Sequence, residues 1–502
     1  MDSREALSAS KSHFWILQLS FLCFLLLAVC SSSAKTLSQK KFHTIDVEEF
    51  RLKNGQDVSK CKAQQLENSN TEQGQKLKGG VQIGLSHTHG ACSPLRPLNS
   101  SWLDMVRERL ERDESHVNAI KFRIAASNSA DINSAGANLP LQSGRKYDTG
   151  NYIVTAGFGT PAKKFLLTID TGSDVTWMQC QPCSDQDACY SQVDPIFNPK
   201  QSSSYKRLGC LSSQCLALTG ATGSLFPCST SGCVYEVRYG DGSTSEGDFS
   251  QETLTLASDS FPNFAFGCGH TNTGLFKASA GLLGLGRNQL SFPSQSASKY
   301  GGQFSYCLPD FSSAQGSGSL SLGQGSIPSS ASFTPLLSNP AASSFYFLGL
   351  TDISVGGERL FLSPGLFQPT SGGGGTIIDS GTVITRLTQT AYDALKAAFR
   401  KKTAHLPSAD RFSILDTCYN LAGYNRVQIP TITFHFQGNA NVDVNGIGIL
   451  VSVSDDGSHV CLAFASASDD LSIIGNFQQQ RFRIAYDTRT KRIGFAPQSC
   501  SH

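Results

Sequence analysis

From residue 147 to the C-terminus, apolar residues occur in short runs that alternate with polar residues and are interrupted by glycine, proline and serine. Runs such as 150–158 (GNYIVTAGF) and 345–355 (FYFLGLTDISV) carry the β-branched and aromatic residues that favour strands. One amphipathic helix is predicted at 388–402, where apolar residues recur four positions apart. The pattern therefore predicts an all-β, turn-rich fold for most of the chain.

The most informative regularity is a strand-and-turn pattern that occurs twice. An apolar run precedes the sequence DTGS at 170–173, and another precedes DSGT at 379–382. Later in each half comes an apolar-apolar-glycine element, LLG at 282–284 and IIG at 473–475. Because strand-forming residues lead into a tight glycine turn each time, each half should hold one aspartate at the tip of a strand. Residues 308–344, rich in Ser, Gly and Pro, are expected to cross between the two halves.

Residues 1–34 are predicted to be a secretory signal peptide, because basic residues precede an apolar stretch at 14–29 and small residues follow it. A signal anchor and a plastid transit peptide are the alternatives. The apolar stretch is of marginal length for spanning a bilayer, and a transit peptide is normally Ser-rich without so long an apolar block.

Residues 35–146 are polar and are interpreted as a propeptide, with a disordered extension as the alternative. Within them, residues 101–124 have apolar side chains at helical spacing. The small, polar linker 127–136 should be accessible to proteases, so removal is expected to end near residues 135–146. Asn99 begins an N-x-[ST] sequon and is the predicted glycosylation site.

The chain has 16 cysteines, and the twelve from Cys180 to Cys500 form an even set that predicts six disulfides in a secreted protein. Seven of them lie in residues 180–233, a segment with little apolar periodicity. This segment is predicted to be a loop-rich insertion held by disulfides, with one cysteine pairing outside it and Cys268 as the nearest candidate. A zinc site at Cys180 is not predicted, because no second C-x-x-C and no nearby His ligands follow.

The formal net charge of +2 argues against a general polyanion-binding protein. The sequence has no P-loop, no H-E-x-x-H and no G-x-S-x-G motif, so nucleotide, zinc-hydrolase and serine-hydrolase chemistry are not indicated. No metal and no other cofactor is expected.

Two aspartates, Asp170 and Asp379, are the candidate catalytic residues. Two carboxylates placed face to face cannot both ionise easily, so they share one proton. The ionised carboxylate can take a proton from a water molecule while the protonated one donates to a carbonyl oxygen, which allows amide hydrolysis without a metal or a covalent intermediate. Neighbouring residues are expected to allow close backbone approach, to bond the outer carboxylate oxygens, and to reach across between the loops. Gly172 and Gly381 should allow the close backbone approach, and Ser173 and Thr382 should bond the outer oxygens. Thr171 and Ser380 should reach across between the loops.

On these residues the chain resembles the pepsin-like aspartic proteases, and more closely their nepenthesin-type plant branch. The similarity extends from about Asn151 to Cys500 and includes the hairpin at 239–243 (YGDGS) and the cysteine-rich segment. It implies an all-β, bilobed fold with the active-site cleft between two pseudo-two-fold-related lobes. The N-terminal lobe would comprise residues 147–340 with the insertion at 180–233, and the C-terminal lobe residues 341–502.

The resemblance also implies particular roles outside the two aspartate loops. Tyr239, Gly240 and Asp241 would form the tip of a flap over the substrate, with Trp177 near its base. Cys418 and Cys461 would pair within the C-terminal lobe.

The leading functional hypothesis is a secreted, monomeric aspartic endopeptidase made as a zymogen, extracellular (apoplastic) or vacuolar, that cleaves peptides and proteins with apolar residues at the scissile bond. The alternative from another class is a catalytically silent binding protein, such as the protease-like xylanase inhibitors that share this fold. Residues 412–418 and 475–485 are similar to the chloroplast nucleoid DNA-binding protease subgroup, which keeps a plastid location as an alternative. Nucleic-acid binding is not expected, because the positive charges are scattered and the pI is about 7.8.

Overall fold

The computed structural model describes residues 41–50, 74–90, 93–96, 100–128, 152–183, 188–222, 228–230, 232–239, 243–274, 278–309, 318–370 and 373–497. The elements below belong to one compact unit that begins at Phe42. Four predictions lie outside the described residues: the signal peptide, the glycosylation site Asn99, the cleavage region 135–146, and the flap residues Gly240 and Asp241. None of the helices in the described part of the chain has the length and apolar character needed to cross a membrane.

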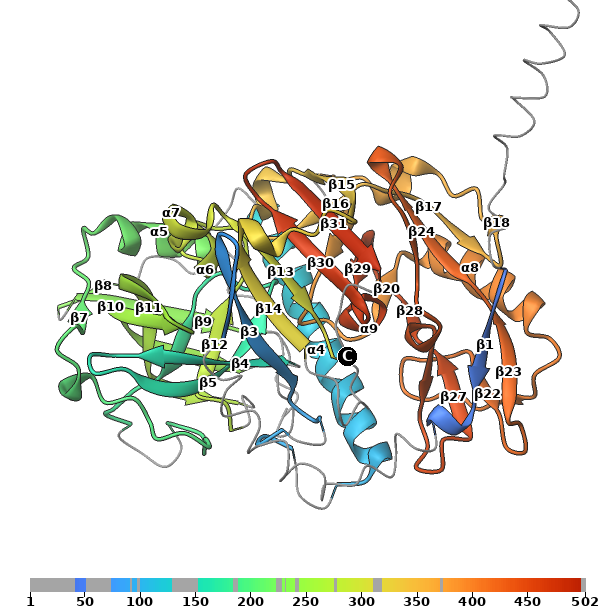
Figure 1. The fold of residues 1–502 in the computed structure, drawn as a ribbon, viewed down its shortest axis with the longest axis horizontal. Helices are drawn as coiled ribbons and strands as arrows, with labels where there is room; N and C mark the ends of the chain where they lie inside the picture. The colour runs from blue at the N-terminus through green and yellow to red at the C-terminus, as the bar shows by residue number, and fades with distance from the viewer. Residues whose placement is uncertain are drawn as a thin grey trace, which may run out of the picture. The chain divides into compact units, whose positions relative to one another are not determined.

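The N-terminal lobe is a strongly connected set of strands, shown in teal to yellow-green in Figure 1. Its long hairpin of β10 and β11 pairs with β9 and β6, and β12 lies between β5 and β6. The strands are β4 (Tyr152–Phe158), β5 (Lys163–Asp170), β6 (Trp177–Gln179), β7 (Lys206–Arg207), β8 (Cys228–Ser229), β9 (Gly232–Arg238), β10 (Thr244–Leu256), β11 (Asp259–Thr273) and β12 (Gly281–Gly284). The helices are α5 (Ser213–Thr222), α6 (Phe292–Gln295) and α7 (Ala297–Tyr300).

An antiparallel sheet joins segments from both ends of the described chain. Its order is β2, β3, β14, β13, β30, β31 and β15. The strands are β2 (Gln75–Leu77), β3 (Gly80–His87), β13 (Gln303–Cys307), β14 (Gly318–Gly323), β15 (Ser332–Leu337), β30 (Phe482–Asp487) and β31 (Arg492–Pro497). This central sheet lies between the two lobes in Figure 1.

The C-terminal lobe repeats the strand-and-turn arrangement of the N-terminal lobe and adds two small sheets, of order β18-β17-β24-β25 and β21-β22-β27-β26. Its strands are β16 (Phe347–Leu348), β17 (Leu350–Val355), β18 (Glu358–Arg359), β19 (Gly375–Ile378), β20 (Thr385–Leu387), β21 (Ser408–Ala409), β22 (Cys418–Asn420), β23 (Arg426–Pro430), β24 (Ile432–Phe436), β25 (Asn441–Asp443), β26 (Leu450–Ser452), β27 (His459–Leu462), β28 (Phe464–Ser466) and β29 (Leu471–Ile474). The helices are α8 (Gln389–Lys402) and α9 (Asn476–Gln479). The fold is therefore the bilobed, mostly β acid-protease fold that the sequence predicts.

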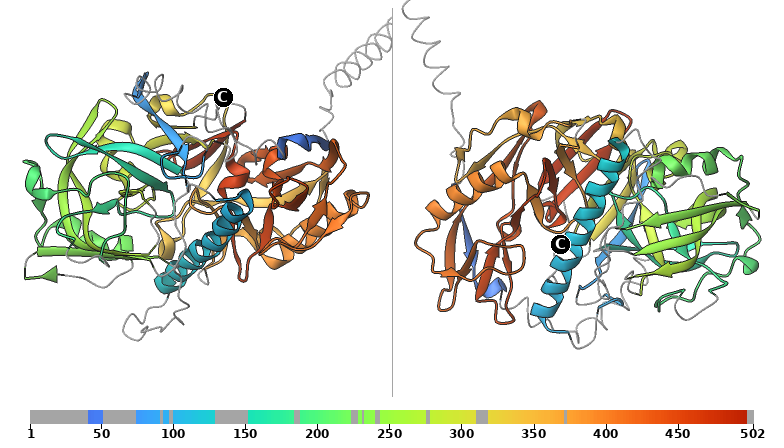
Figure 2. Two further views of the ribbon diagram at one scale, coloured as in Figure 1. Left: turned by 90° about the horizontal axis from the view of Figure 1, so that it is seen from below. Right: turned by 180° about the vertical axis from the view of Figure 1, so that it is seen from behind.

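The segment interpreted as a propeptide contributes to both lobes and to the central sheet. Strand β1 (Phe42–Asp46) pairs with β23 at the edge of the C-terminal lobe, and β3 pairs with β14. Helix α4 (Trp102–Asn128) runs along the junction between the lobes, as both views in Figure 2 show. The helix lies where its apolar spacing predicts it, whereas β1 and β3 were not predicted.

Two further expectations differ from the structure. Residues 308–344 do not simply cross between the halves, because they include β14 and β15 of the central sheet. The small residues of β14 (GSLSLG) are all buried there, a role that their Ser/Gly composition conceals. The insertion at 180–233 also contains a helix, α5, which packs its buried face against β9.

Strand β3 should contribute measurably to stability, because Val81, Ile83 and Leu85 alternate along it and are 1%, 5% and 1% exposed. We predict that Ile83→Ala costs about 2–5 kcal/mol, as expected for a buried aliphatic truncation, and lowers the thermal unfolding midpoint of the full chain. Differential scanning calorimetry of the purified full chain measures this.

Gly84→Ala is the matched control on the next residue, because an added Cβ there meets no atom within 4 Å. Equal midpoints for Ile83→Ala and Gly84→Ala would contradict the role of β3 as part of the core.

Candidate active site

The strands before and after the Asp170 loop both pair with the same strand, β12. Strand β5 runs parallel to β12, with Asp170 opposite Gly284, and the backbone N–H of Leu285 donates to the carbonyl oxygen of Asp170 at 2.9 Å. After the loop, β6 returns antiparallel to the same β12. The LLG element of the sequence is thus the strand that fixes this aspartate.

The loop that carries Asp379 is built in the same way. Strand β19 runs parallel to β29, the N–H of Asp379 donates to the carbonyl oxygen of Ile474 at 3.1 Å, and β20 returns antiparallel to β29. The side chain of Gln479 adds a hydrogen bond to the carbonyl oxygen of Asp379 at 2.9 Å. Each half of the duplication therefore holds one carboxylate on a strand tip.

The two carboxylates lie together and are fully buried, Asp170 being 1% and Asp379 0% exposed. Asp170 accepts hydrogen bonds from the backbone N–H of Gly172 at 2.9 Å and from the hydroxyl of Ser173. Asp379 accepts from both the N–H and the hydroxyl of Thr382 at 2.8 Å. These donors stabilise the ionised forms of both side chains.

Contacts across the interface hold the loops to each other. The N–H of Ser380 donates to the hydroxyl oxygen of Thr171 at 2.8 Å, and the N–H of Thr171 donates to the hydroxyl oxygen of Ser380 at 3.2 Å. The hydroxyl of Thr171 also donates to Asp379 Oδ1 at 3.0 Å. Since the exchange is reciprocal, neither loop can shift without breaking a buried hydrogen bond of the other.

Glycine is required beside each aspartate because the opposite carboxylate comes very close. A Cβ at Gly172 would lie 3.0 Å from Asp379 Oδ1, and a Cβ at Gly381 would lie 2.6 Å from Asp170 Oδ1. Any larger residue would push the carboxylates apart.

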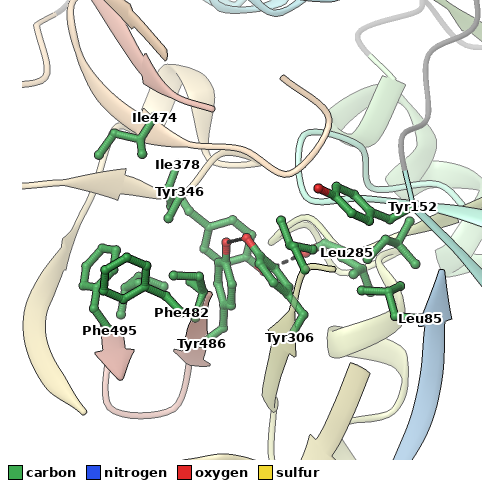
Figure 3. Packing of buried hydrophobic residues seen from close by; sticks show 14 of the residues in the cluster. Leu85, Tyr152, Leu285, Tyr306, Tyr346, Ile378, Ile474, Phe482, Tyr486 and Phe495 are labelled. Atoms are coloured by element: carbon green, nitrogen blue, oxygen red, sulfur yellow. Dashed lines mark hydrogen bonds between the residues drawn. The ribbon is translucent and has the colours of Figure 1, made fainter. Parts of the chain in front are cut away.

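A cluster of tyrosines is linked by hydrogen bonds to the elements that hold the two loops. Figure 3 shows the rings of Tyr306, Tyr346 and Tyr486 converging on one another. The hydroxyl oxygens of Tyr306 and Tyr486 lie 2.7 Å apart. The hydroxyl of Tyr306 donates to the side-chain oxygen of Gln479, the residue that holds the Asp379 backbone. The hydroxyl of Tyr346 donates to the carbonyl oxygen of Leu285, next to the strand that fixes Asp170. The cluster therefore links the two halves of the site.

Strands β9 and β10 pair antiparallel and form a hairpin, and Tyr239 follows β9. The indole N–H of Trp177 donates to the hydroxyl oxygen of Tyr239 at 2.7 Å. The structure brings these two residues together, and their roles at the tip and base of a flap stay a prediction. The structure also joins Cys418 to Cys461, the pair implied by the resemblance, and Cys180 to Cys268, the candidate outside the insertion.

The main feature that sequence reasoning missed is His116 of helix α4. Its Nε2 lies 2.8 Å from Asp379 Oδ2, and both side chains are buried. The available signal was a set of polar residues on the apolar face of the helix, at positions 109, 112, 113 and 116, all of which are buried. Polar groups on a buried face need specific partners.

The partners of that polar face lie on and beside the Asp379 loop. The carboxylate of Asp113 accepts from the backbone N–H groups of Val383 and Ile384 and pairs with Arg386 at 2.9 Å, and Arg386 itself is 1% exposed. Apolar side chains of α4 pack against the C-terminal lobe around this contact, namely Trp102, Met105, Val106 and Leu110 with Val383, Ile384 and Phe477.

The electrostatics of the site follow from burial and from these contacts. Burial, and then the nearby charge of Asp379, raise the pKa of Asp170 to about 6. Burial alone would lower the pKa of His116, but the charge of Asp379 and the hydrogen bond to it raise it to about 9. Burial alone would raise the pKa of Asp379, yet the imidazolium of His116 and the donors of Thr382 hold it below its ordinary range. The arrangement favours one protonated and one ionised aspartate at mildly acid pH.

Two groups of side chains in the described part of the chain have donor atoms close enough to hold a metal ion. In one, the donor atoms of His116, Asp170 and Asp379 lie within 4.8 Å of one another, but the protein itself supplies hydrogen-bond donors to both carboxylates. The other contains Cys418 and Cys461, whose disulfide removes both thiolate ligands. Neither group offers the open, unpaired ligand set of a metal centre.

Comparisons with known proteins agree with this geometry. Family models described as xylanase inhibitor N-terminal and xylanase inhibitor C-terminal match residues 152–324 and 345–497. An aspartyl protease family protein of Arabidopsis thaliana is 45% identical over 84% of this chain and 87% of its own length. Aspartic proteinase nepenthesin-2 of Nepenthes gracilis is 36% identical over 80% of this chain and 87% of its own.

Solved structures with the same fold include basic 7S globulin from soybean, with a TM-score of 0.54 and 20% identity over 69% of this chain and 92% of that one. A second, described as edgp, has a TM-score of 0.55 and 22% identity over 69% of this chain and 91% of that one. At this identity the likeness shows the fold alone.

The hydroxyl of Thr382 should tune the acidity of Asp379, because it donates directly to the carboxylate. We predict that Thr382→Val shifts the acid limb of the pH–rate profile upward and reduces kcat/KM roughly tenfold, since a hydrogen bond to a charged group contributes about 1.5–3 kcal/mol. Steady-state hydrolysis of a peptide from pH 2 to 7 measures both effects.

Thr376→Val is the matched control, because the buried Thr376 hydroxyl has no hydrogen-bond partner in the described part of the chain. A profile that moves equally in both variants would show that the Thr382 hydroxyl has no specific effect on the carboxylate.

Proposed function

This chain belongs to the pepsin-like aspartic proteases of plants, and we propose that it is an active, secreted endopeptidase that is made as a zymogen. The observation that carries the proposal is the complete pair of aspartate loops, each with its hydroxyl donor and its cross-loop hydrogen bonds. A silent relative of the inhibitor class would need neither carboxylate, so the second candidate, a protease-like binding protein, explains less of this site.

In the proposed reaction one carboxyl of the pair is ionised and the other protonated, because two carboxylates held together do not both ionise easily. A water molecule takes the position that His116 Nε2 now occupies and transfers a proton to the pair as it attacks the peptide carbonyl. The protonated carboxyl donates to the carbonyl oxygen, which gives a neutral tetrahedral intermediate. The carboxyl that took the proton from water then gives it to the leaving nitrogen, and the C–N bond breaks. A hydroxyl of the intermediate returns its proton to the other carboxylate, so the pair regains its starting state and a carboxylic acid product is formed.

Helix α4 would keep the enzyme inactive, because His116 contacts the carboxylate that must bind water. The helix ends at Asn128, and the expected cleavage region 135–146 follows it. A cut there would separate the segment that holds α4 and β3 from the lobes in sequence, but the site would open only when α4 leaves the Asp379 loop.

Secretion is supported by the disulfides, which form and persist in oxidising compartments. An extracellular or vacuolar location, a monomeric state and apolar residues at the scissile bond complete the proposal. A plastid location is the alternative, and contact with nucleic acid is not proposed.

Both aspartates should be essential. We predict that Asp170→Asn and Asp379→Asn each reduce kcat on the order of a thousandfold or more, because the pair acts as a unit. Hydrolysis of a peptide library by purified protein, with folding checked by circular dichroism, measures this.

Asp393→Asn, an exposed aspartate on α8, is the control and should keep full activity. Retention of more than a few per cent of activity in either loop variant, or loss of wild-type activity on EDTA treatment, would disprove the two-aspartate mechanism.

The contact between His116 and Asp379 should make α4 acid-labile, and the sign follows from the two pKa shifts. The depressed pKa of Asp379 stabilises docking above its ordinary pKa of about 3.9, and this is lost as the pH falls. The raised pKa of His116 stabilises docking below about 6.5, and this is lost as the pH rises through about 9. Docking is therefore strongest between about pH 4 and 6.5.

We predict that His116→Ala raises the initial rate of the uncleaved chain at pH 5 by about tenfold or more, because breaking a buried charge pair costs about 3 kcal/mol or more. Initial rates are measured with a fluorogenic peptide while gels confirm that the chain is uncleaved. Asn118→Ala, an exposed residue on the same helix, should leave the rate at the wild-type level. An unchanged rate in His116→Ala would mean that this contact does not hold the zymogen closed.

A further inference from the structure

The side chain of Arg123, two helical turns after His116 on α4, lies beside the Asp170 loop. One of its N–H groups donates to the carbonyl oxygen of Gly172, and Nη2 lies 3.9 Å from Asp174 Oδ2. The guanidinium is also 4.8 Å from the centre of the Phe345 ring. A carbonyl oxygen, a carboxylate and an aromatic face are the three kinds of partner that a planar guanidinium binds best.

Asp174 is buried, with 1% of its surface exposed. Its Oδ1 accepts a hydrogen bond from the N–H of Asn288 at 3.0 Å, whereas Oδ2 has no hydrogen-bond partner in the described residues and faces Arg123. A buried carboxylate oxygen without a hydrogen-bond partner costs free energy of folding. This oxygen is therefore a good acceptor for a donor placed beside it.

A second cation whose charge interacts with Asp174, Arg287, directs the hydrogen bonds of its Nη1 elsewhere. Arg287 directs its Nη1 to the carbonyl oxygens of Leu337, at 3.4 Å, and Phe345, at 3.0 Å. Burial raises the pKa of Asp174, and the charge of Arg123 opposes that effect before any other group does. Arg123 is therefore the direct counter-ion of Asp174 while α4 is in place.

The release of α4 would remove this counter-ion. What remains is a recess beside the catalytic loop, formed by the carbonyl oxygen of Gly172, the carboxylate of Asp174 and the ring of Phe345. The recess adjoins the pair of aspartates, because Gly172 and Asp174 belong to the loop that carries Asp170. A small cavity between α4 and the N-terminal lobe extends from it towards Tyr239. Its lining includes Arg123, Asp174 and Val175, and also Arg238, whose charge is paired with Glu236.

We propose that the recess of Gly172, Asp174 and Phe345 is a subsite for a basic side chain of the substrate, selective for arginine. This inference rests on the proposed protease function and adds a polar determinant to the apolar residues expected at the scissile bond. Arginine should be preferred over lysine, because only a planar fork can donate to the carbonyl oxygen and the carboxylate while it lies over the ring.

The subsite should bind a substrate residue close to the scissile bond. An extended substrate advances about 3.3 Å per residue, so a recess that adjoins the catalytic loop is within reach of the first few residues on one side of the bond. Arg123 of the propeptide would then act as a substrate mimic at this position.

The test uses the acid-activated full chain and a series of peptides that share one apolar scissile pair. Arginine, lysine or citrulline is placed at each of the three positions on either side, and kcat and KM are measured separately. Citrulline has the shape of arginine without its charge. We expect one position at which arginine raises kcat/KM about tenfold over citrulline, mainly through KM, as one charged contact of about 1.5 kcal/mol provides.

For each variant we compare kcat/KM for the arginine peptide with kcat/KM for the citrulline peptide. Because the result is a ratio, a change that affects both peptides equally cancels. Asp174→Asn should bring this ratio close to one, and Phe345→Leu should lower it partially. The control Asp393→Asn should keep the wild-type ratio. A wild-type enzyme that cleaves arginine and citrulline peptides equally at all positions would overturn the subsite while leaving the protease function intact.

If no peptide is hydrolysed, the protease function fails and the recess is tested by binding. Synthetic peptides of residues 101–128, with arginine or citrulline at position 123, are titrated onto the acid-activated chain. The arginine peptide should bind about tenfold more tightly for the same charged contact. Equal affinities would overturn the inference.

Discussion

The structure depends on two carboxyl groups that are held together in a buried interface. Removing carboxylates from water is costly unless each finds donors, and two of them together also repel. The chain meets this cost locally, with the donors of Gly172 and Ser173 for Asp170 and those of Thr382 for Asp379. The cost of burying the two carboxyls is thus offset within two short loops. The backbones of these loops are fixed by parallel strands and by the tyrosine cluster.

Helix α4 provides positively charged side chains that offset the cost of burying carboxylates in the two lobes. His116 supplies a positive charge to Asp379, and Arg123 supplies one to Asp174 behind the other loop. Each contact removes part of the cost of burying a carboxylate, so the helix is held partly by an aspartate that catalysis would use. A segment that blocks the site can therefore also stabilise it, which explains why a long polar helix is buried at the junction of the lobes.

The fold alone does not distinguish an enzyme from a silent relative. The family models that match this chain are named after xylanase inhibitors, whereas the relatives with similar sequences are named as aspartic proteases. The distinction lies in the site, where both aspartates keep their hydroxyl donors. A Cβ on Gly381 would collide with the carboxylate of Asp170, and a Cβ on Gly172 would crowd that of Asp379. A binding protein has no need for such close approach.

Local patterns in the sequence determined the bilobed β fold, the two aspartate loops and helix α4, because strand alternation, helical spacing and glycine turns act over a few residues. Tertiary structure alone decided the rest. His116 meets an aspartate 263 positions away, and no local pattern specifies which surface the polar face of a helix will contact. Strand β3 alternates Val81, Ile83 and Leu85, yet its role became visible only when β14 lay beside it. A strand or a buried charge is defined by its partner, and those partners are brought together only by folding.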